Sequence, residues 1–362
     1  MTVCADDVRY MSRALELARH GLYTTDPNPR VGCVLVRDGV VVGEGFHERA
    51  GEPHAEVLAL RAAGDAAAGA TAYVTLEPCA HHGRTPPCAD ALIAARIARV
   101  VAAISDPNPL VSGGGFKRLV QAGIETAAGV CETEATEINV GFIARMTRSR
   151  PFVRVKIAAS LDGRTALASG ASQWITEDAA RLDGQRLRAR SSAILTGIGT
   201  VRADDPSLTV RAFDIGRQPL RVVVDSGMQM SPHARMLSLP GRTWVVGARA
   251  PATQHLRKAG AEVSLLPGND GRVDLGELMS DMARREINEV LVEAGATLNG
   301  ALLAAGLVDE LVIYFAPHLM GSAERAMFAL PPLARMDDRV ALTISDMRKV
   351  GNDWRVTATV HN

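Results

Sequence analysis

Three potential metal ligands and one acid lie in two short segments between residues 53 and 88. The first segment reads Pro-His-Ala-Glu at 53–56, and the second runs from Thr-Leu-Glu-Pro-Cys at 75–79 to a further cysteine at 88. His54, Cys79 and Cys88 would give zinc one nitrogen and two sulfur ligands, and three protein ligands leave a fourth position open for water. In zinc deaminases, a glutamate placed like Glu56 carries protons while zinc-activated water attacks a ring carbon that bears an amine. The pattern therefore predicts a catalytic zinc site, and a deaminase, in the first third of the chain.

The same residues could instead form a structural zinc clip or a pair of buried thiols. A structural site would need a fourth protein ligand, which His81 or His82 could supply. Glu56 favours catalysis, because a structural site has no use for a proton carrier beside His54.

The spacing of the two cysteines carries further information. The general zinc-deaminase signature has two residues between its cysteines, whereas eight stand between Cys79 and Cys88. This longer loop would place His82 and Arg84 at the mouth of the site. Such a loop suits a substrate with more polar groups than a bare nucleoside, for instance a phosphate.

Two polar residues that precede the ligands are weaker candidates for the site. Asn28 is flanked by prolines that stiffen its backbone, and His47 follows an expected strand. Each also has a plainer interpretation, Asn28 as a turn residue and His47 as a surface-loop histidine.

Composition limits the classes of protein that the chain could represent. Its 362 residues favour two domains, and 47% hydrophobic residues suffice for buried cores. Lysine plus arginine equals aspartate plus glutamate, at 40 each, so no general attraction to nucleic acid or to an anionic membrane is expected. We expect no membrane span, because no run of 18 apolar residues occurs, and no signal peptide. Five cysteines fit a reducing cytoplasm better than a disulfide framework.

The first part of the chain alternates between expected helices and strands, with a hairpin at Asp38-Gly39. In this arrangement His54 lies at the start of one expected helix and Cys88 at the start of the next. The ligands can therefore converge from two adjacent helix N-termini. We expect helices over 6–20, 54–63, 87–95 and 116–122, and strands over 31–37, 40–46, 70–76 and 99–104.

A basic, proline-ended segment at 145–151 suggests a domain junction, and we place the domains at 1–147 and 148–362. Near-continuous apolar strands after it predict a mostly parallel sheet covered on both faces, closed by two antiparallel strands. The expected strands are 152–158, 193–200, 220–226, 243–248, 261–267, 289–295, 310–317, 340–346 and 353–360, with helices near 177–190, 251–259, 274–285 and 297–304.

A nucleotide site in the second domain is suggested but not established by its motifs. The G-x-G-x-x-G fingerprint is absent, since 197–202 carries only its first two glycines. A strand, then Glu293-Ala294-Gly295, then a helix could cradle a phosphate at the helix N-terminus. Tight helix–strand packing would explain Gly295 equally well.

Motifs in both domains, taken in order, resemble one family over the region from the first helix to about Gly321. They include P-N-P-R-V-G-C-V at 27–34, G-E-P-H-A-E at 51–56, the 75–88 segment, A-A-S-L-D-G-R-T-A at 158–166, S-Q-W-I-T at 172–176, the 195–211 segment and V-E-A-G-A-T-L-N-G-A-L-L at 292–303. The chain resembles the bifunctional riboflavin-biosynthesis deaminase–reductases, and the cysteine spacing agrees with that family.

The resemblance implies a cytidine-deaminase-like α/β/α domain followed by a dihydrofolate-reductase-like α/β reductase domain. The first would bind Zn²⁺ and remove an amine from a diaminohydroxy-phosphoribosylaminopyrimidine with release of ammonia. The second would use NADPH to reduce the ribosyl group to ribityl. The resemblance makes His54, Cys79 and Cys88 the zinc ligands and Glu56 the proton donor.

The resemblance also implies roles for residues of both domains. Substrate contacts in the first domain would come from Asn28, His47, His82 and Arg84. Cofactor positions in the second would be Ala158, Trp174, Thr200, Asp204, Ser226, Gly295, Ala296, Thr297, Leu298, Asn299, Gly300 and Ala301. Substrate positions there would be Ser172, Arg188, Leu208, Arg211 and Glu293, with Lys156 assisting at the reacting sugar.

Two other functions compete with this interpretation. One is a nucleoside or tRNA-base deaminase with an unrelated α/β appendage, which the balanced charge and second-domain motifs disfavour. The other is a non-catalytic zinc module for protein binding, which Glu56 disfavours. We expect a small-molecule substrate, no nucleic-acid or membrane partner, and a homo-oligomer.

Overall fold

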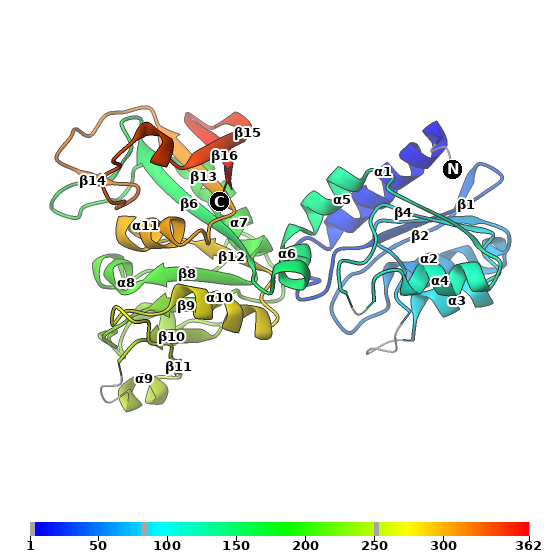
Figure 1. Cartoon of the computed structure of the whole chain (residues 1–362), viewed down its shortest axis with the longest axis horizontal. Helices are drawn as coiled ribbons and strands as arrows, with labels where there is room; N and C mark the ends of the chain where they lie inside the picture. The colour runs from blue at the N-terminus through cyan, green and yellow to red at the C-terminus, as the bar shows by residue number, and fades with distance from the viewer. Residues whose placement is uncertain (1–3, 81–85, 110, 250–252, 362) are drawn as a thin grey trace. The chain divides into compact units, whose positions relative to one another are not determined.

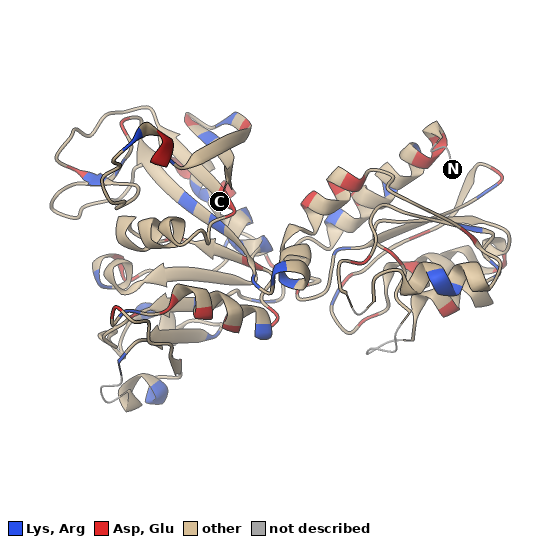
Figure 2. Ribbon diagram, viewed as in Figure 1, with Lys and Arg blue, Asp and Glu red and all other residues tan. Residues whose placement is uncertain are grey.

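The computed structural model describes residues 4–80, 86–109, 111–249 and 253–361. The chain divides into two compact units, residues 1–149 and 150–362, and each is considered by itself (Figure 1). Acidic and basic residues occur along the ribbon of both units (Figure 2). Within the described residues, no helix has the length and apolar character needed to cross a membrane.

The first unit is built on a five-stranded sheet in the order β2-β1-β3-β4-β5. β1 is antiparallel to both β2 and β3, whereas β3, β4 and β5 are parallel. Loops that follow β3 and β4 therefore leave the same edge of the sheet. The elements are α1 Ala5–His20, β1 Gly32–Arg37, β2 Val40–Phe46, α2 Ala55–Ala63, η1 Gly64–Ala67, β3 Thr71–Val74, α3 Cys88–Ala94, β4 Arg99–Ala102, α4 Gly114–Gln121, β5 Glu125–Ala128, α5 Glu132–Ile138 and α6 Val140–Arg148.

The expected hairpin is confirmed, and glycines bring the helices onto its strands. Asp38 and Gly39 both have positive φ, 52° and 75°, as a two-residue hairpin turn of this kind requires. A Cβ at Gly32 would lie 2.0 Å from the Ala14 carbonyl oxygen of α1, and one at Gly45 would lie 2.5 Å from the Ala55 oxygen of α2. Both helices can therefore pack against the hairpin more closely than any larger residue would permit.

A buried acid links α1 to the sheet of this unit. Asp7 is 1% exposed and accepts hydrogen bonds from Arg99 Nη1 at 2.7 Å and Tyr73 Oη at 3.0 Å. Its carboxylate also accepts from the Cys4 backbone N–H, which caps α1. The hydrogen bond from Arg99 lowers the pKa of Asp7 to about 2.

Replacing Asp7 by asparagine should lower the stability of this unit by about 2 kcal/mol at pH 7. The folded pKa lies below the ordinary value of about 3.9, so the carboxylate's contribution is complete above that pH and is lost as pH falls toward 2. The difference between the two proteins should therefore shrink below about pH 4. Urea unfolding followed by circular dichroism from pH 7 to pH 3 measures it; a difference independent of pH would contradict the assignment.

The second unit contains a nine-stranded sheet in the order β11-β10-β9-β8-β12-β6-β13-β16-β15. Neighbours from β11 to β13 are parallel, and β16 and β15 close the sheet in antiparallel fashion, as expected. The elements are β6 Phe152–Ser160, β7 Arg164–Ala166, α7 Asp178–Arg190, β8 Ala193–Gly197, α8 Ile198–Asp204, β9 Leu220–Val224, η2 Arg235–Ser238, β10 Thr243–Gly247, α9 Gln254–Lys258, β11 Glu262–Leu265, α10 Leu275–Arg284, β12 Glu289–Val292, α11 Ala296–Ala304, β13 Glu310–Ala316, β14 Arg325–Ala326, η3 Met336–Asp338, β15 Ala341–Val350 and β16 Asp353–His361.

Alternate side chains of the central strands enter cores on opposite faces of this sheet. On β12, Val290 and Val292 belong to one cluster and Leu291 to another; on β8, Leu195 and Ile194 separate in the same way. The expected sheet covered on both faces is confirmed.

Several expected strands of the second unit were too long, 193–200 and 289–295 by three residues each. The apolar segment 193–200 was expected to be a strand throughout, but β8 ends at Gly197, which has extended geometry and begins α8 as its N-cap. Thr200 therefore lies on a helix directly after the strand. The helices α5 and α6, and strand β5, were not expected either.

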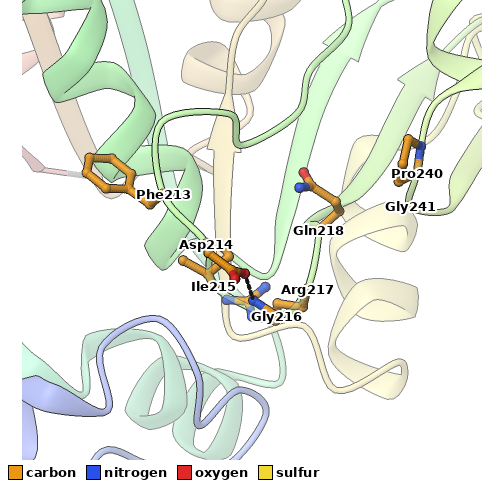
Figure 3. A pocket seen from close by; sticks show the side chains of 8 residues that line it. All are labelled: Phe213, Asp214, Ile215, Gly216, Arg217, Gln218, Pro240 and Gly241. Carbon is orange, nitrogen blue, oxygen red and sulfur yellow. Dashed lines mark hydrogen bonds between the residues drawn. The ribbon is translucent and has the colours of Figure 1, made fainter.

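A cavity of about 350 Å³ lies between residues 213–218 and 240–241, at the amino ends of β9 and β10 (Figure 3). Ligands of parallel α/β sheets bind outside the carboxyl ends of the strands, which is the opposite edge. None of the residues predicted for the second domain's site lines this cavity.

Candidate metal centre and reductase site

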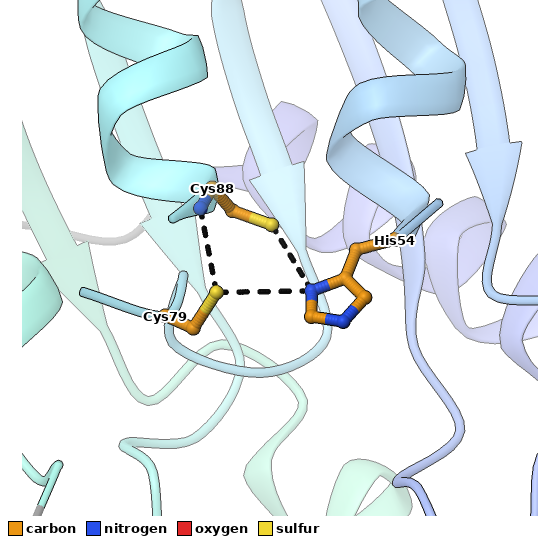
Figure 4. A group of neighbouring side chains, drawn as sticks. All are labelled: His54, Cys79 and Cys88. Atoms are coloured by element: carbon orange, nitrogen blue, oxygen red, sulfur yellow. Dashed lines mark hydrogen bonds between the residues drawn. The ribbon is translucent and has the colours of Figure 1, made fainter. Parts of the chain in front are cut away.

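The three predicted metal ligands converge, each placed by the start of a helix or the end of a strand. His54 is the N-cap of α2, Cys88 is the first residue of α3, and Cys79 lies in the loop after β3. His54 Nδ1 lies 3.2 Å from Cys88 Sγ and 3.7 Å from Cys79 Sγ (Figure 4). All three ligand atoms lie within 4.8 Å of one another. One imidazole and two thiols at this separation fit zinc in its usual tetrahedral coordination.

The environment of Cys79 favours the thiolate, which is the form that binds metal. Hydrogen bonding from Cys88 lowers the pKa of Cys79 to about 4, and His54 contributes in the same direction. The Cys88 backbone N–H, at the start of α3, donates to Cys79 Sγ at 3.3 Å. Without metal, Cys79 is therefore the sulfur that carries the negative charge, whereas its hydrogen bond with Cys79, together with burial, raises the pKa of Cys88.

Glu56 lies in the first turn of α2, next to the ligands. It is 3% exposed, and burial raises its pKa to about 7. A carboxyl group with a pKa near neutrality can both accept and donate a proton at physiological pH. The close approach of α2 to β2 at Gly45 holds this helix start against the sheet.

His47 and Asn28 meet beside the ligands. His47 Nε2 lies 3.0 Å from Asn28 Nδ2, and His47 Nδ1 lies 3.2 Å from the Pro53 carbonyl oxygen. Since that carbonyl can only accept, Nδ1 carries the proton and Nε2 accepts from the amide. Burial lowers the pKa of His47, which favours this neutral form.

His47 is also in contact with a metal ligand, since its ring packs edge-on against His54 with centroids 5.2 Å apart. Because it is only 2% exposed, the surface-loop interpretation of His47 is wrong. The predicted contacts His82 and Arg84, and the alternative fourth ligand His81, lie outside the described residues.

In the second unit, a partly buried ion pair lies at the carboxyl end of β12. Arg188 on α7 donates to both carboxylate oxygens of Glu293, at 2.6 and 2.9 Å, and to the Thr209 carbonyl oxygen at 3.1 Å. Burial alone would raise the pKa of Glu293, but the guanidinium of Arg188 outweighs it and the pKa falls to about 2. Lys156 on β6 is half-buried in the same region, and its removal from solvent lowers its pKa. Its Nζ lies 5.8 Å from the centre of the Tyr314 ring.

The predicted cofactor residues lie on several segments that follow strands of the parallel sheet. Gly295 is the N-cap of α11, which contains residues 296–301, and Ser226 follows β9 and accepts from the Val273 N–H at 3.2 Å. Thr200 Oγ1 on α8 lies 4.0 Å from the position of a Cβ at Gly295. Two of the predicted segments therefore meet at the carboxyl edge of the sheet.

Packing does not explain the glycine at 295. Its φ of −79° is open to any residue, and a Cβ there would have no neighbour closer than Thr200 Oγ1. Gly300, in contrast, is required by packing, because a Cβ would lie 2.3 Å from the Ala329 carbonyl oxygen.

The remaining predicted residues of the second unit are placed as follows. Asp204 ends α8 and forms a side-chain hydrogen bond with Ser172. Arg211 donates its backbone N–H to Gln185 Oε1 at 2.9 Å. Trp174 is 69% exposed, and the Arg181 guanidinium lies 4.5 Å from the centre of its ring. Ala158 lies on β6, and Leu208 is buried with a φ of 46°.

Two buried polar residues that sequence reasoning missed hold loops of the first unit. Asn139 bonds both backbone groups of Arg30, at 2.8 and 2.9 Å, and so anchors the loop that carries Asn28. Glu77, two residues before Cys79, accepts four backbone hydrogen bonds. The only sequence signal for Glu77 was a charged residue directly after a buried strand.

Known proteins resemble both units of this chain. Residues 5–104 match the zinc-binding region of cytidine and deoxycytidylate deaminases, and residues 151–356 match the RibD C-terminal domain. The riboflavin biosynthesis protein RibD of Escherichia coli (strain K12) is 52% identical over 359 residues, covering 96% of this chain and 97% of the relative.

Solved structures agree over the full length. Form 1 of Acinetobacter baumannii RibD has a TM-score of 0.93 at 46% identity, covering 99% of both chains. A Thermotoga maritima diaminohydroxyphosphoribosylaminopyrimidine deaminase/5-amino-6-(5-phosphoribosylamino)uracil reductase has a TM-score of 0.88 at 33% identity, covering 98% of this chain and 99% of the other.

Fold and site together define a protein that joins a cytidine-deaminase-type zinc domain to an α/β reductase domain. More narrowly, the chain belongs to the RibD family of riboflavin-biosynthesis proteins. The fold class and the family expected from the sequence are thereby confirmed.

Proposed function

We propose that residues 1–147 deaminate 2,5-diamino-6-(5-phosphoribosylamino)pyrimidin-4-one and that residues 148–362 then reduce the product with NADPH to 5-amino-6-(5-phosphoribitylamino)uracil. The observation that carries the first activity is the convergence of His54, Cys79 and Cys88 beside buried Glu56. A solved relative whose name states both activities, and which matches over both units, supports the second.

In the deaminase, Glu56 has the role of proton carrier. Zinc held by the three ligands supplies Lewis acidity that lowers the pKa of a water molecule. Deamination puts oxygen in place of the amine, so a proton must leave the water and another must reach the departing nitrogen. Glu56, with a pKa of about 7, is suited to both transfers. Asn28, oriented by His47, is the proposed contact to the pyrimidine, and His82 and Arg84 are proposed contacts to the substrate or its phosphate.

In the reductase, NADPH supplies a hydride. Reduction adds it to the sugar carbon that carries the amine, breaks that carbon's bond to the ring oxygen, and places a proton on the oxygen. We assign Lys156 to assist at this carbon, because burial lowers the pKa of its ammonium group and makes the proton easier to release. Arg188 and Glu293 orient each other and the substrate, with Ser172, Leu208 and Arg211 as further substrate contacts.

The proposed cofactor contacts begin at the N-terminus of α11, where the backbone N–H groups favour a phosphate. Residues 295–301 form this part of the site. The other proposed contacts are Ala158, Trp174, Thr200, Asp204 and Ser226.

Replacing Gly295 by valine should weaken NADPH binding about tenfold or more without lowering thermal stability. The structure leaves space for a Cβ at this position, whereas a phosphate seated on α11 would meet the added side chain. Gly300→Ala is the comparison, because its Cβ would clash with the Ala329 carbonyl and lower stability. Calorimetric titration with NADPH, together with thermal unfolding, separates the two. If Gly295→Val bound NADPH like the wild type, the proposal that the cofactor binds at this position would be wrong.

We also propose a homo-oligomer in the cytoplasm. β15 forms the outer edge of the nine-stranded sheet, and its exposed apolar side chains Leu342, Ile344 and Met347 would be covered by a second copy. The five cysteines form no disulfide, so Cys79 and Cys88 are free to bind zinc, which agrees with a reducing compartment. Sedimentation equilibrium tests the assembly.

The first test of the proposed function is the dependence of ammonia release on metal. Purified protein should contain one zinc ion per chain, lose ammonia release when a chelator removes it, and recover when zinc returns. Release that persists in metal-free protein would exclude the mechanism.

A further inference from the structure

Glu77 is a buried carboxylate that bonds only to backbone. It is 3% exposed, and its hydrogen bonds with described residues all come from backbone N–H groups. Its Oε2 accepts from the N–H groups of Asp106 at 3.0 Å and Gly113 at 3.1 Å. Its Oε1 accepts from Gly115 at 2.9 Å and Phe116 at 3.2 Å. Three of these four donors belong to the start of α4, so Glu77 caps a helix whose N-cap, Gly113, lies 36 residues after it.

The capped helix start is pressed against the peptide that precedes Cys79. A Cβ at Gly115 would lie 1.9 Å from the Pro78 carbonyl oxygen and 3.1 Å from the Pro78 carbonyl carbon. Only glycine permits this approach. The start of α4 therefore packs against the backbone between Glu77 and Cys79 and limits where that backbone can move.

Cys79 is in turn hydrogen-bonded to the segment that carries the second sulfur ligand, Cys88. Its carbonyl oxygen accepts from the Ala89 N–H at 3.1 Å, and its Sγ accepts from the Cys88 N–H at 3.3 Å. Contacts therefore run without a break from α4, through Glu77 and Pro78, to Cys79 and the start of α3. Asp106 and Gly113, both after β4, are attached to the same carboxylate.

We propose that Glu77 is a positioning residue for the metal centre: its carboxylate fixes Cys79 by tying the backbone next to it to the start of α4. This inference rests on the proposed zinc site and extends it to a residue outside the ligand set. A carboxylate is needed because four N–H donors point at two oxygens. Glutamine would turn an NH₂ group toward two of those donors, leaving them unpaired in a buried place.

The test uses full-length protein loaded with Co²⁺ in place of zinc, because cobalt reports its coordination through thiolate charge-transfer and ligand-field absorption. Glu77→Gln should weaken cobalt affinity about 10- to 100-fold and shift these bands. Asp7→Asn is the matched control, since Asp7 is an equally buried acid of the same unit that caps α1, away from the ligands. It should lower stability while leaving cobalt affinity and spectrum unchanged.

A second pair of variants changes the contact between the start of α4 and Pro78. These variants test whether this contact positions Cys79 even if Glu77→Gln does not fold. Gly115→Ala should displace Pro78 and alter the cobalt spectrum. Gly114→Ala, whose Cβ would meet only Ala80 Cβ at an ordinary 3.6 Å, should not.

The outcomes separate this inference from the site on which it rests. Wild-type protein without a thiolate–cobalt band would overturn the proposed metal centre itself. A wild-type band that Glu77→Gln and Gly115→Ala both reproduce, at wild-type affinity, would overturn the role of Glu77. So would an Asp7→Asn protein whose cobalt affinity and spectrum change as much, because general destabilisation would then explain the effect.

Discussion

Glu56→Gln should retain zinc and lose ammonia release by about a thousandfold or more. Glutamine keeps the size of the side chain but cannot take a proton from water or give one to the departing amine. Because Glu56 is not one of the three converging ligands, metal content should stay at one ion per chain. Ammonia release by a coupled assay, with zinc measured by atomic absorption on the same sample, provides both readings.

The reductase gives this experiment its internal control. Glu56→Gln should reduce chemically supplied deaminated substrate at the wild-type rate, which shows that the second unit is folded, and retained zinc shows that the first unit still forms its metal centre. A zinc-loaded Glu56→Gln protein that still releases ammonia at a rate near wild type would mean that another group carries the proton.

Cys79→Ser should lose zinc and deamination together while reduction continues. Serine offers an alcohol oxygen whose pKa is far above that of the thiol, so it cannot replace the thiolate as a zinc ligand at neutral pH. Cys88→Ser should likewise lose zinc and deamination and keep reduction. The two units have separate cores, so loss of metal from the first should leave the second folded.

The measurement for the cysteine variants is NADPH oxidation with deaminated substrate, followed at 340 nm beside the ammonia assay. A separately expressed fragment of residues 147–362 should oxidise NADPH in the same way. Loss of reduction in a folded Cys79→Ser protein would show that the two activities depend on each other.

The metal centre could be predicted from sequence because its information is local. His54 and Glu56 are two residues apart, and each ligand segment lies next to a helix start that its own sequence predicts. The hairpin was predictable for a similar reason, since Asp38-Gly39 suits the positive φ values that its turn requires.

The supports of the site could not be predicted, because they depend on contacts between distant segments. Asn139 meets Arg30 across 109 residues, and Glu77 meets Gly115 across 38. Neither pairing leaves a periodic or compositional signal in one sequence. The environment of His47 was misjudged for the same reason, since its burial arises when Asn28 and Pro53 pack around it.

The length of β8 shows how tertiary structure overrides a local pattern. Residues 193–200 are apolar enough to continue as a strand, but the backbone turns into α8 after Gly197. That turn places Thr200 beside Gly295, on the edge where we propose the cofactor. Apolar composition alone does not distinguish a strand that ends from one that continues.

Turnover of 2,5-diamino-6-(5-phosphoribosylamino)pyrimidin-4-one with and without NADPH, with the products identified by mass spectrometry, tests the two-step account most directly. Without NADPH, wild-type protein should release one ammonia per substrate and accumulate the deaminated ribosyl compound. With NADPH, the same ammonia should appear, and the product should be the ribityl compound, heavier by two hydrogens. Reduction without deamination, or no ammonia from zinc-loaded protein under either condition, would contradict the account.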